Sequence, residues 1–398
     1  MADFKTIYRE DSVLYLLERD PTSSKASFCV THPGHLAGEE GAHWLNLNAL
    51  AEVDLPERDL ALIKDGRARA VNLAHPAAKR LMEESGGNAP KKRRVHILAL
   101  GDVGATLLMG LKLMGGDVVS EIGIYDPREA FLARYEQEIN QIALPFAYDA
   151  MPDVTILEKR QLFSCDVFVF CASAGVPAVG SEDSDVRMAQ LESNMCILKE
   201  YARMARDSQY PGLFAVVSDP VDLLCRYAYL ESNRNEEGET DHLGLLAEQI
   251  RGYGLGVMNA RAAYYAKKET RFSSFLQEGR AYGPHGQGLV IANSIVDYDE
   301  TLSTELTKKA VEANLEMRAL GFKPYIAPAL SSGALSILLT LRREWHYSAV
   351  ALGGTYFGCR NRETPFGLET EAMPLPQALF SRLKLAYDRL KLQEKELE

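Results

Sequence analysis

The segment 97-ILALGDVGATLLMGLKLMGG-116 decides how the rest of the sequence is interpreted. An apolar run ends at Leu100, two glycines follow at Gly101 and Gly104, and a leucine-rich stretch with helical spacing comes next. A buried strand that turns through glycines into a helix presents backbone N–H groups that can bind a phosphate. Ala99 stands where a three-glycine fingerprint would begin, so the motif is weak by itself and its meaning depends on the residues downstream of it.

Strands and helices alternate downstream of this turn. Two stretches have helical patterns, 103–114 and 186–205. Between and around them lie short apolar runs rich in β-branched and aromatic residues, at 95–100, 121–126, 165–172 and 213–219. Such alternation predicts a Rossmann-type α/β fold, a doubly wound parallel sheet with helices on both faces. Sheets of this kind bind ligands at the carboxyl ends of their strands.

Asp126 ends the second of these strands, twenty-two residues after Gly104. A carboxylate at this distance can bind the ribose hydroxyls of a dinucleotide and would repel a 2′-phosphate, so the sequence predicts NAD in preference to NADP. Asp126 followed by Pro127 is also a good helix start, and the two roles are compatible. We therefore expect the cofactor to contact Asp126 and the turn residues Gly101, Asp102, Val103 and Gly104.

Composition excludes several classes of function. The 398-residue chain carries 44 basic and 55 acidic residues, a net charge of −11, which disfavours binding to nucleic acid or to an anionic membrane surface. No apolar run approaches the roughly 20 residues of a membrane-spanning helix, and residues 1–11 lack the apolar core of a signal peptide. We expect a cytoplasmic protein without a metal site, its six scattered cysteines reduced and in the core.

Five further motifs follow in order along the chain. They are 173-SAGVP-177, 187-RMAQLESN-194, 218-SDPVDLL-224, 254-GLGVMNAR-261 and 283-GPHGQG-288. Together with the glycine turn and Asp126, these motifs resemble the lactate/malate dehydrogenase family, from about Val95 to the C-terminal segment. The resemblance implies an NAD-dependent oxidoreductase that transfers hydride between NAD(H) and a 2-hydroxy or 2-oxo acid.

The resemblance also implies roles for individual residues. His285 matches the family's catalytic histidine, and an imidazole suits proton exchange with the substrate because its pKa lies near neutrality. Arg187 matches the lid arginine that polarises the substrate carbonyl. Arg261 matches the arginine that binds the substrate carboxylate, which a guanidinium can hold with two parallel hydrogen bonds. Ser331 matches a substrate-pocket hydroxyl. Ala174 and Gly175 match the cofactor-binding loop.

Two positions depart from the family pattern. Met258 stands where the family has the aspartate that orients the histidine, and a thioether is an uncharged, poor hydrogen-bond acceptor. Asp219 stands where the family has asparagine. We hypothesise that Asp219 pairs with His285 in place of the lost carboxylate and acts as a catalytic residue. The alternative is that Asp219 repels an anionic substrate, and that the chain has lost rapid catalysis and binds NAD(H) as a sensor.

The segment after the lid proline bears on the substrate. Malate-type enzymes carry a second arginine there, and this chain has Ala178, so we expect a lactate-type monocarboxylate substrate. Gly333 stands where the family often has tryptophan, which predicts a wider pocket. Another NAD-using class, the NAD-dependent glycosidases, is disfavoured because the sequence shows no cysteine–histidine metal motif.

We expect three domains. These are a small, mostly-β N-terminal domain of unknown role (1–90), an NAD-binding Rossmann domain (91–254) and an α+β substrate domain (255–398). In the first, the patterns predict strands at 11–18 and 26–33 and a hairpin over 60–73 that turns at Asp65-Gly66. The nearby His32, His35 and His43 are interpreted as surface-loop residues. The amphipathic segment 376–398 is expected to pack on its own domain, in a homodimer or homotetramer.

Overall fold

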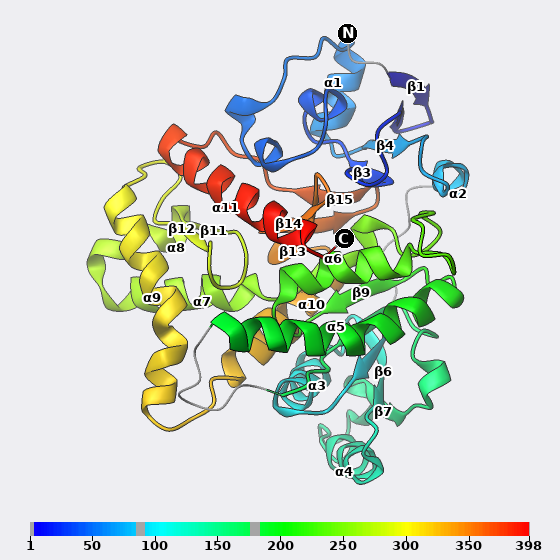
Figure 1. Cartoon of the computed structure of the whole chain (residues 1–398), viewed down its shortest axis with the longest axis vertical. Coiled ribbons are helices and arrows are strands. Elements are labelled where there is room, and N and C mark those ends of the chain that lie inside the picture. Colours follow the sequence, from blue (N-terminus) through cyan, green and yellow to red (C-terminus); the bar gives the residue numbers. More distant parts are fainter. Residues whose placement is uncertain (1–3, 85–91, 176–183, 398) are drawn as a thin grey trace.

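A large mixed sheet organises the computed structural model, which describes residues 4–84, 92–175 and 184–397, with side chains from Gln190 onward in the last range (Figure 1). Its described strands lie in the order β15 (Gly367–Thr370), β14 (Thr355–Thr364), β13 (His346–Leu352), β10 (Ile250–Gly252), β9 (Leu213–Val216), β8 (Val167–Phe170), β5 (Arg93–Leu98), β6 (Val119–Tyr125) and β7 (Asp153–Ile156). The strands from β10 to β7 are parallel, whereas β13, β14 and β15 are antiparallel. The prediction of a parallel α/β sheet is confirmed.

The order of the parallel strands reverses between β5 and β8. The chain moves outward from β5 to β6 and β7 and then returns to β8, which pairs with the other side of β5. Open α/β sheets bind ligands in the crevice at such a switch point, outside the carboxyl ends of the strands. Gly101 follows the end of β5 and Ala174 follows the end of β8, so both predicted cofactor loops lie at this crevice.

Helices cover both faces of this sheet. Val167 and Val169 of β8 belong to a hydrophobic cluster with α3 (Asp102–Met114), α4 (Glu129–Asn140) and α10 (Ser336–Leu341). Phe168 and Phe170 belong to a second cluster with α5 (Ser184–Asp207) and α6 (Val221–Ser232). Successive side chains of a strand point to opposite faces, so this run of four apolar residues buries both faces of the sheet.

Residues 255–398 continue the sheet and add a separate helical layer. In that layer α7 (Leu255–Lys268), α8 (Phe275–Glu278) and α9 (Glu300–Ala319) share a hydrophobic cluster with the hairpin of β11 (Arg280–Tyr282) and β12 (Val290–Ala292). The sheet itself crosses the predicted boundary at 254, because β10 pairs with β13. The chain ends in α11 (Gln377–Lys395), which Figure 1 shows beneath the N-terminal region.

The N-terminal region is a small mixed sheet with helices. Its strands lie in the order β1 (Phe4–Tyr8), β2 (Val13–Leu17), β4 (Ala68–Asn72) and β3 (Ser27–Cys29), and the helices are α1 (Glu57–Lys64) and α2 (Ala78–Glu83). The predicted strands at 11–18 and 26–33 are confirmed, but the predicted hairpin over 60–73 is wrong. Asp59 and Ile63, the buried residues of α1, are spaced as on a helix face, and Gly66 with φ +68° follows the end of α1.

The largest hydrophobic cluster of the N-terminal region is shared with the rest of the chain. Phe28 and Trp44 lie in one hydrophobic cluster with Phe357 of β14 and Leu383 of α11. The expectation of a separate, mostly-β domain is therefore not confirmed. Among the described helices, none is long and apolar enough to cross a membrane.

Two predictions about single side chains need correction. His35 is not a surface-loop residue, since it is buried and stacks on Trp44 with ring centres 4.5 Å apart. Burial lowers the pKa of His35 to about 3, so its ring is neutral. Of the six free cysteines, Cys29, Cys165, Cys225 and Cys359 are buried as expected, Cys171 is half-buried and Cys196 is exposed.

Candidate functional site

The turn after β5 leaves open space at the N-terminus of α3. Gly101 caps the N-terminus of α3, and a Cβ added to it would meet no atom within 4 Å, so its backbone faces open space. A Cβ at Gly104 would lie 2.0 Å from the carbonyl oxygen of Ala99, so only glycine allows α3 to pack this close to the strand end. Asp102 is exposed and Val103 is half-buried in the first turn of α3. The first-turn amides and the helix dipole can together bind an anion.

Ala99 adopts the backbone conformation of the glycine that it replaces. Its φ is +74°, in the left-handed region, and an alanine in that region costs about 1–2 kcal/mol. Its N–H donates to the carbonyl of Tyr125 at 2.8 Å, which joins the turn to the end of β6. The backbone at position 99 therefore adopts the conformation of the usual glycine, although the residue is alanine.

Asp126 lies just after β6, and its carboxylate already has several partners. Oδ2 accepts hydrogen bonds from the Leu100 N–H and from Nη2 of Arg128, both at 2.8 Å. Oδ1 accepts from the Arg128 N–H at 3.0 Å and from its Nε at 2.8 Å. Burial alone would raise the pKa of Asp126, but these hydrogen bonds and the charge of Arg128 lower it. The Asp126 side chain is only 1% exposed and is paired with the half-exposed Arg128, so in this structure its carboxylate is not open to a further ligand.

Asn194 joins the loops that follow β8 and β9. Its side chain is buried on α5, accepts a hydrogen bond from the Ala174 N–H at 2.9 Å and donates to the carbonyl of Asp219 at 2.7 Å. Gly175 continues the first loop with φ +128°. The predicted cofactor loop and the Asp219 loop are thus side by side. Arg187 lies in the first turn of α5, and its side chain is outside the described part of the chain.

His285 and Asp219 form an ion pair. Nδ1 of His285 lies 2.9 Å from Oδ1 of Asp219, so the hypothesised contact between these residues is confirmed. The two side chains are 17% and 54% exposed, so a ligand can reach the pair. Among the described residues, none forms a hydrogen bond with Nε2 of His285, and this nitrogen is therefore the one that can exchange a proton with a ligand.

Asp222 supports His285 from the buried side. Its Oδ2 accepts a hydrogen bond from the His285 N–H at 3.2 Å, and burial raises the pKa of Asp222 to about 7. Burial also acts to lower the pKa of His285. The charge and hydrogen bond of Asp219, aided by Asp222, outweigh both this burial and the opposing charge of Arg261, and they raise the pKa of His285 above 6.5. The pair therefore favours an imidazolium that can donate a proton.

Arg261 lies one turn after Met258 on α7. Its Nη1 is 3.5 Å from the sulfur of Met258 and 3.3 Å from the carbonyl oxygen of Ala310, while no described residue bonds its Nε or Nη2. Burial lowers the pKa of Arg261, and the charge of Asp219 acts in the opposite direction. Arg261, Asp219 and His285 are therefore close enough for their charges to interact. Met258 is buried in the apolar cluster around α7 and provides no carboxylate.

The start of α7 packs tightly against the histidine. A Cβ at Gly254 would lie 2.8 Å from Cβ of His285, so a larger residue would displace the imidazole. The π-helical stretch Pro328–Leu335 holds this helix start from the other side. Ser332 Oγ donates to the Gly254 carbonyl at 2.6 Å and accepts from the Val257 N–H at 2.8 Å.

The same stretch contains the loosely matched positions. Ser331 is half-buried, and its carbonyl would lie 2.6 Å from a Cβ at Gly256 of α7, so it is near the helix start. A Cβ at Gly333 would lie 2.7 Å from Cδ1 of Leu107 on α3. The space of the absent side chain is filled by Leu107, so the structure does not support the widened pocket expected from Gly333.

Three positioning residues were missed from the sequence, namely Asn194, Asp222 and Ser332. Asn194 and Asp222 lie inside motifs that were recognised, but the sequence did not show which loop amides they bond. Asp222 offered one usable signal, since a carboxylate three residues after Asp219 in the opening turn of a helix lies near its N-terminal amides. Among the described residues, no group of three histidine, cysteine, aspartate or glutamate side chains could hold a metal ion.

The fold and parts of the sequence are similar to known dehydrogenases. No known protein-family profile matches the chain. It is 25% identical over 194 residues to L-lactate dehydrogenase of Staphylococcus epidermidis, which covers 49% of this chain and 55% of that protein. It is 28% identical over 198 residues to L-lactate dehydrogenase of Treponema denticola, covering 49% and 56%. The chain thus spans about half the length of the curated relatives it matches.

Solved structures give a longer match at lower identity. A lactate dehydrogenase from a Medee basin deep-sea metagenome library superposes with a TM-score of 0.62 at 16% identity, covering 77% of this chain and 99% of that one. Malate dehydrogenase from Archaeoglobus fulgidus in complex with NADH gives a TM-score of 0.61 at 16% identity, covering 76% and 99%. At this identity the similarity establishes the fold.

Proposed function

We propose that this chain, a divergent relative of the lactate and malate dehydrogenases, is an NAD-dependent oxidoreductase that transfers hydride between NAD(H) and a 2-hydroxy or 2-oxo acid. The main support is the His285–Asp219 ion pair, 2.9 Å long, within the electrostatic reach of Arg261. The glycine turn supports cofactor binding, because Gly101 leaves open space at the N-terminus of α3. When bound, the nicotinamide supplies or accepts the hydride.

His285 is the proposed acid and base of the reaction. Asp219 bonds Nδ1, which directs the proton exchange to Nε2 and favours the imidazolium. The protonated ring donates to the carbonyl oxygen during reduction of an oxo acid, and the neutral ring accepts the hydroxyl proton in the reverse direction. Because Asp219 raises the pKa of His285, reduction should persist to higher pH than an ordinary imidazole would allow.

Two arginines are the proposed substrate ligands. Arg261 can hold a carboxylate through Nε and Nη2, which no described residue bonds. Arg187 is proposed to polarise the carbonyl, and Ser331 to contact the substrate. We propose a lactate-type monocarboxylate because Ala178, which lies outside the described residues, replaces the second arginine of malate-type enzymes.

The ion pair also bears on the sensor alternative. That alternative requires Asp219 to repel an anionic substrate, but an imidazolium 2.9 Å away largely compensates the charge of Asp219. The compensation disfavours the sensor alternative. We also propose a cytoplasmic location and a homodimer or homotetramer.

The test is a turnover assay with a panel of 2-oxo acids, including bulky ones and dicarboxylates, followed by the loss of NADH absorbance. We expect turnover of at least one monocarboxylate and none by the His285→Asn variant. NADH binding without turnover of any oxo acid would instead support the sensor alternative. Equal turnover by His285→Asn and the unaltered chain would remove the imidazole from the mechanism.

A further inference from the structure

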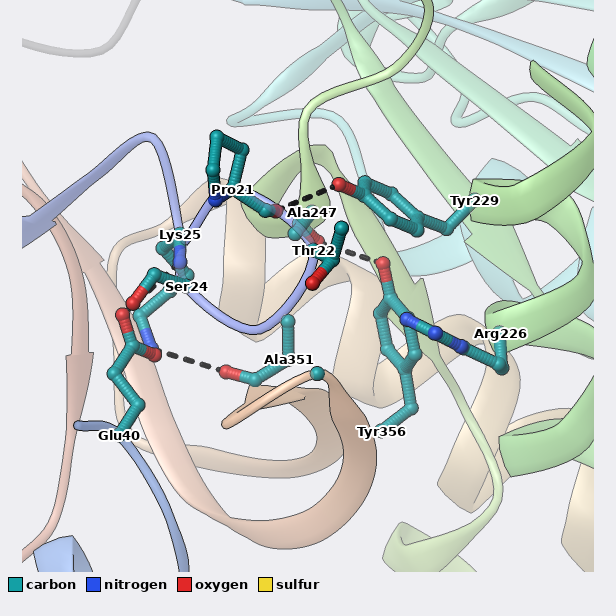
Figure 2. Close-up of a pocket in the computed structure, with 11 residues that line it drawn as sticks. Pro21, Thr22, Ser24, Lys25, Glu40, Arg226, Tyr229, Ala247, Ala351 and Tyr356 are labelled. Atoms are coloured by element: carbon teal, nitrogen blue, oxygen red, sulfur yellow. Dashed lines mark hydrogen bonds and ion pairs between the residues drawn. The ribbon is translucent and has the colours of Figure 1, made fainter. Parts of the chain in front are cut away.

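A polar cavity lies where the N-terminal region meets the rest of the chain, away from the predicted cofactor turn. Its volume is about 140 Å³, and its walls come from the 22–23 loop, α6, the turn between β13 and β14, and α11. A smaller space of about 10 Å³, enough for at most one water, adjoins it and shares Thr22, Arg226 and Gly354 as walls (Figure 2). The larger space can hold a compact polar ligand.

Two glycines fix the shape of this cavity. Gly353 and Gly354 form the two-residue turn between β13 and β14, with φ values of +66° and +80° that suit a hairpin of this length. A Cβ at Gly354 would lie 3.1 Å from the carbonyl oxygen of Thr22 and 3.2 Å from Cα of Ser23. The absence of side chains on the turn therefore lets the 22–23 loop lie directly on it and form the wall.

The walls carry more positive than negative charge. Arg226 of α6 is only 7% exposed, and Lys391 and Lys395 project from α11 one helical turn apart. Among the described residues that line this space, the one acidic residue is Glu394, which is 2% exposed. Burial raises the pKa of Glu394 to about 8, so it is mostly protonated at neutral pH and does not cancel the charges of Lys391 and Lys395.

Two buried side chains of the walls, Glu394 and Thr355, interact with each other. Glu394 accepts a hydrogen bond from the Tyr356 N–H through Oε1 at 3.0 Å, and its carboxylate also interacts with the Thr355 hydroxyl. The same hydroxyl interacts with Tyr387. Because a hydroxyl can rotate, Thr355 can also donate to a ligand in the cavity.

Glu40, the acidic residue that lines the smaller space, does not repel an anion in the larger one. Lys25, in the smaller space, is paired with Glu40 and donates to the carbonyl of Ala351 at 3.1 Å, as Figure 2 shows. The charge of Glu40 is thereby compensated by Lys25. Arg226 lies over the ring of Tyr229, its guanidinium carbon 5.7 Å from the ring centre, and lines both spaces.

We propose that this cavity binds a phosphate group, either as inorganic phosphate or as a small phosphate monoester. A tetrahedral dianion accepts hydrogen bonds in several directions, which matches one guanidinium, two ammonium groups and the hydroxyls of Ser23 and Thr355. A planar carboxylate has fewer acceptor sites than this wall has donors. The site is distinct from the predicted dinucleotide turn.

Helix α6 connects this cavity to the candidate active site. Asp222 in its first turn accepts from the His285 N–H at 3.2 Å, and Arg226 follows four residues later on the same side of the helix. The charges of Arg226 and Asp222 both act on Glu394. The phosphate site is therefore one helical turn from the residue that supports His285.

The test is titration calorimetry of the full chain with inorganic phosphate at neutral pH, with ionic strength matched by potassium chloride. We expect saturable binding that weakens about tenfold or more in a Lys391→Gln/Lys395→Gln variant, because two charge-assisted contacts are lost. Thr355→Val keeps the side-chain volume and should weaken binding severalfold. Lys384→Gln, which removes an exposed lysine of α11 that is ion-paired to Asp388 outside the cavity, is the matched control and should bind as tightly as the unaltered chain.

Titration with glycerol phosphate under the same conditions distinguishes a phosphate monoester from inorganic phosphate as the ligand. Tighter binding of the monoester assigns the site to an ester, and tighter binding of inorganic phosphate assigns it to the free anion. The proposal is overturned if the unaltered chain binds neither probe, or if both are bound equally well by the double-lysine and Thr355→Val variants. This outcome is independent of dehydrogenase turnover, because no cofactor or oxo acid is present.

Discussion

Replacing Asp219 with asparagine should lower turnover by about 10³-fold to 10⁴-fold, the scale seen when a carboxylate that orients a catalytic histidine becomes an amide. Asp219 bonds Nδ1 of His285 at 2.9 Å and is the main cause of the raised pKa of that imidazole. An asparagine can keep the contact but not the charge. The variant should therefore bind NADH normally and lose kcat for the oxo acid.

The pH profile separates this role from a structural one. His285 must be protonated for reduction, so the rate of the unaltered chain should fall as pH rises through its raised pKa. In Asp219→Asn the pKa drops and the fall should move to lower pH, while the reverse oxidation gains from the neutral ring at lower pH. Asp207→Asn, an exposed carboxylate at the end of α5, is the control and should change neither profile. An unchanged rate and profile in Asp219→Asn would end the proposed pairing.

Replacing Arg261 with lysine should raise KM for a 2-oxo acid by roughly 10-fold to 150-fold, because one charge-assisted hydrogen bond worth about 1.5–3 kcal/mol is lost. Lysine keeps the positive charge but not the planar pair of donors that matches a carboxylate. Little stability should be lost, since Nη1 makes only long contacts, at 3.3 Å to Ala310 and 3.5 Å to Met258.

A matched pair of substrates sharpens this test. The amide of the preferred oxo acid lacks the carboxylate charge, so its kcat/KM should be low and nearly the same in Arg261→Lys and the unaltered chain. Only the acid should lose efficiency. Arg134→Lys, at an exposed ion pair of α4 with Glu138, is the control and should leave both substrates unaffected. An equal loss for acid and amide would show that Arg261 acts on the fold and not on the carboxylate.

The Rossmann part of the fold followed from the sequence because its signals are local. Each parallel strand is a short run of buried residues, such as Val167–Phe170, bounded by loops, and helical patterns lie between the runs. The glycine spacing and Asp126 then fixed which strand comes first. The addition of β13–β15 to this sheet depends on one edge pairing, between Gly252 and Ala349, which has no local signal.

The fold of the N-terminal region was harder to predict, because its signals are also not local. Asp65-Gly66 is a strong hairpin signal, but glycine also ends helices, and α1 was recognisable only from the spacing of Asp59 and Ile63. Its shared core with α11 joins residues far apart in sequence, such as Trp44 and Leu383. A pattern within one segment cannot show which distant segment covers it.

The candidate site was predictable to different degrees. Sequence motifs predict His285, Arg261 and Asp219, and the move of a carboxylate from position 258 to position 219 predicts the pairing of Asp219 with His285. The engagement of Asp126 by Arg128 and the packing of Gly333 on Leu107 are side-chain geometries. Both depend on rotamers and helix approach, which motif spacing does not specify.

In the proposed mechanism, His285 and Arg261 act on one bound acid beside the nicotinamide. A crystal structure of the chain with NADH and oxamate, an unreactive analogue of a 2-oxo acid, decides whether they do. We expect Nε2 of His285 within hydrogen-bond distance of the oxamate carbonyl oxygen, Arg261 bonded to the carboxylate, and Asp219 still on Nδ1. Oxamate bound away from both residues, or a nicotinamide ring outside their reach, would rule this mechanism out.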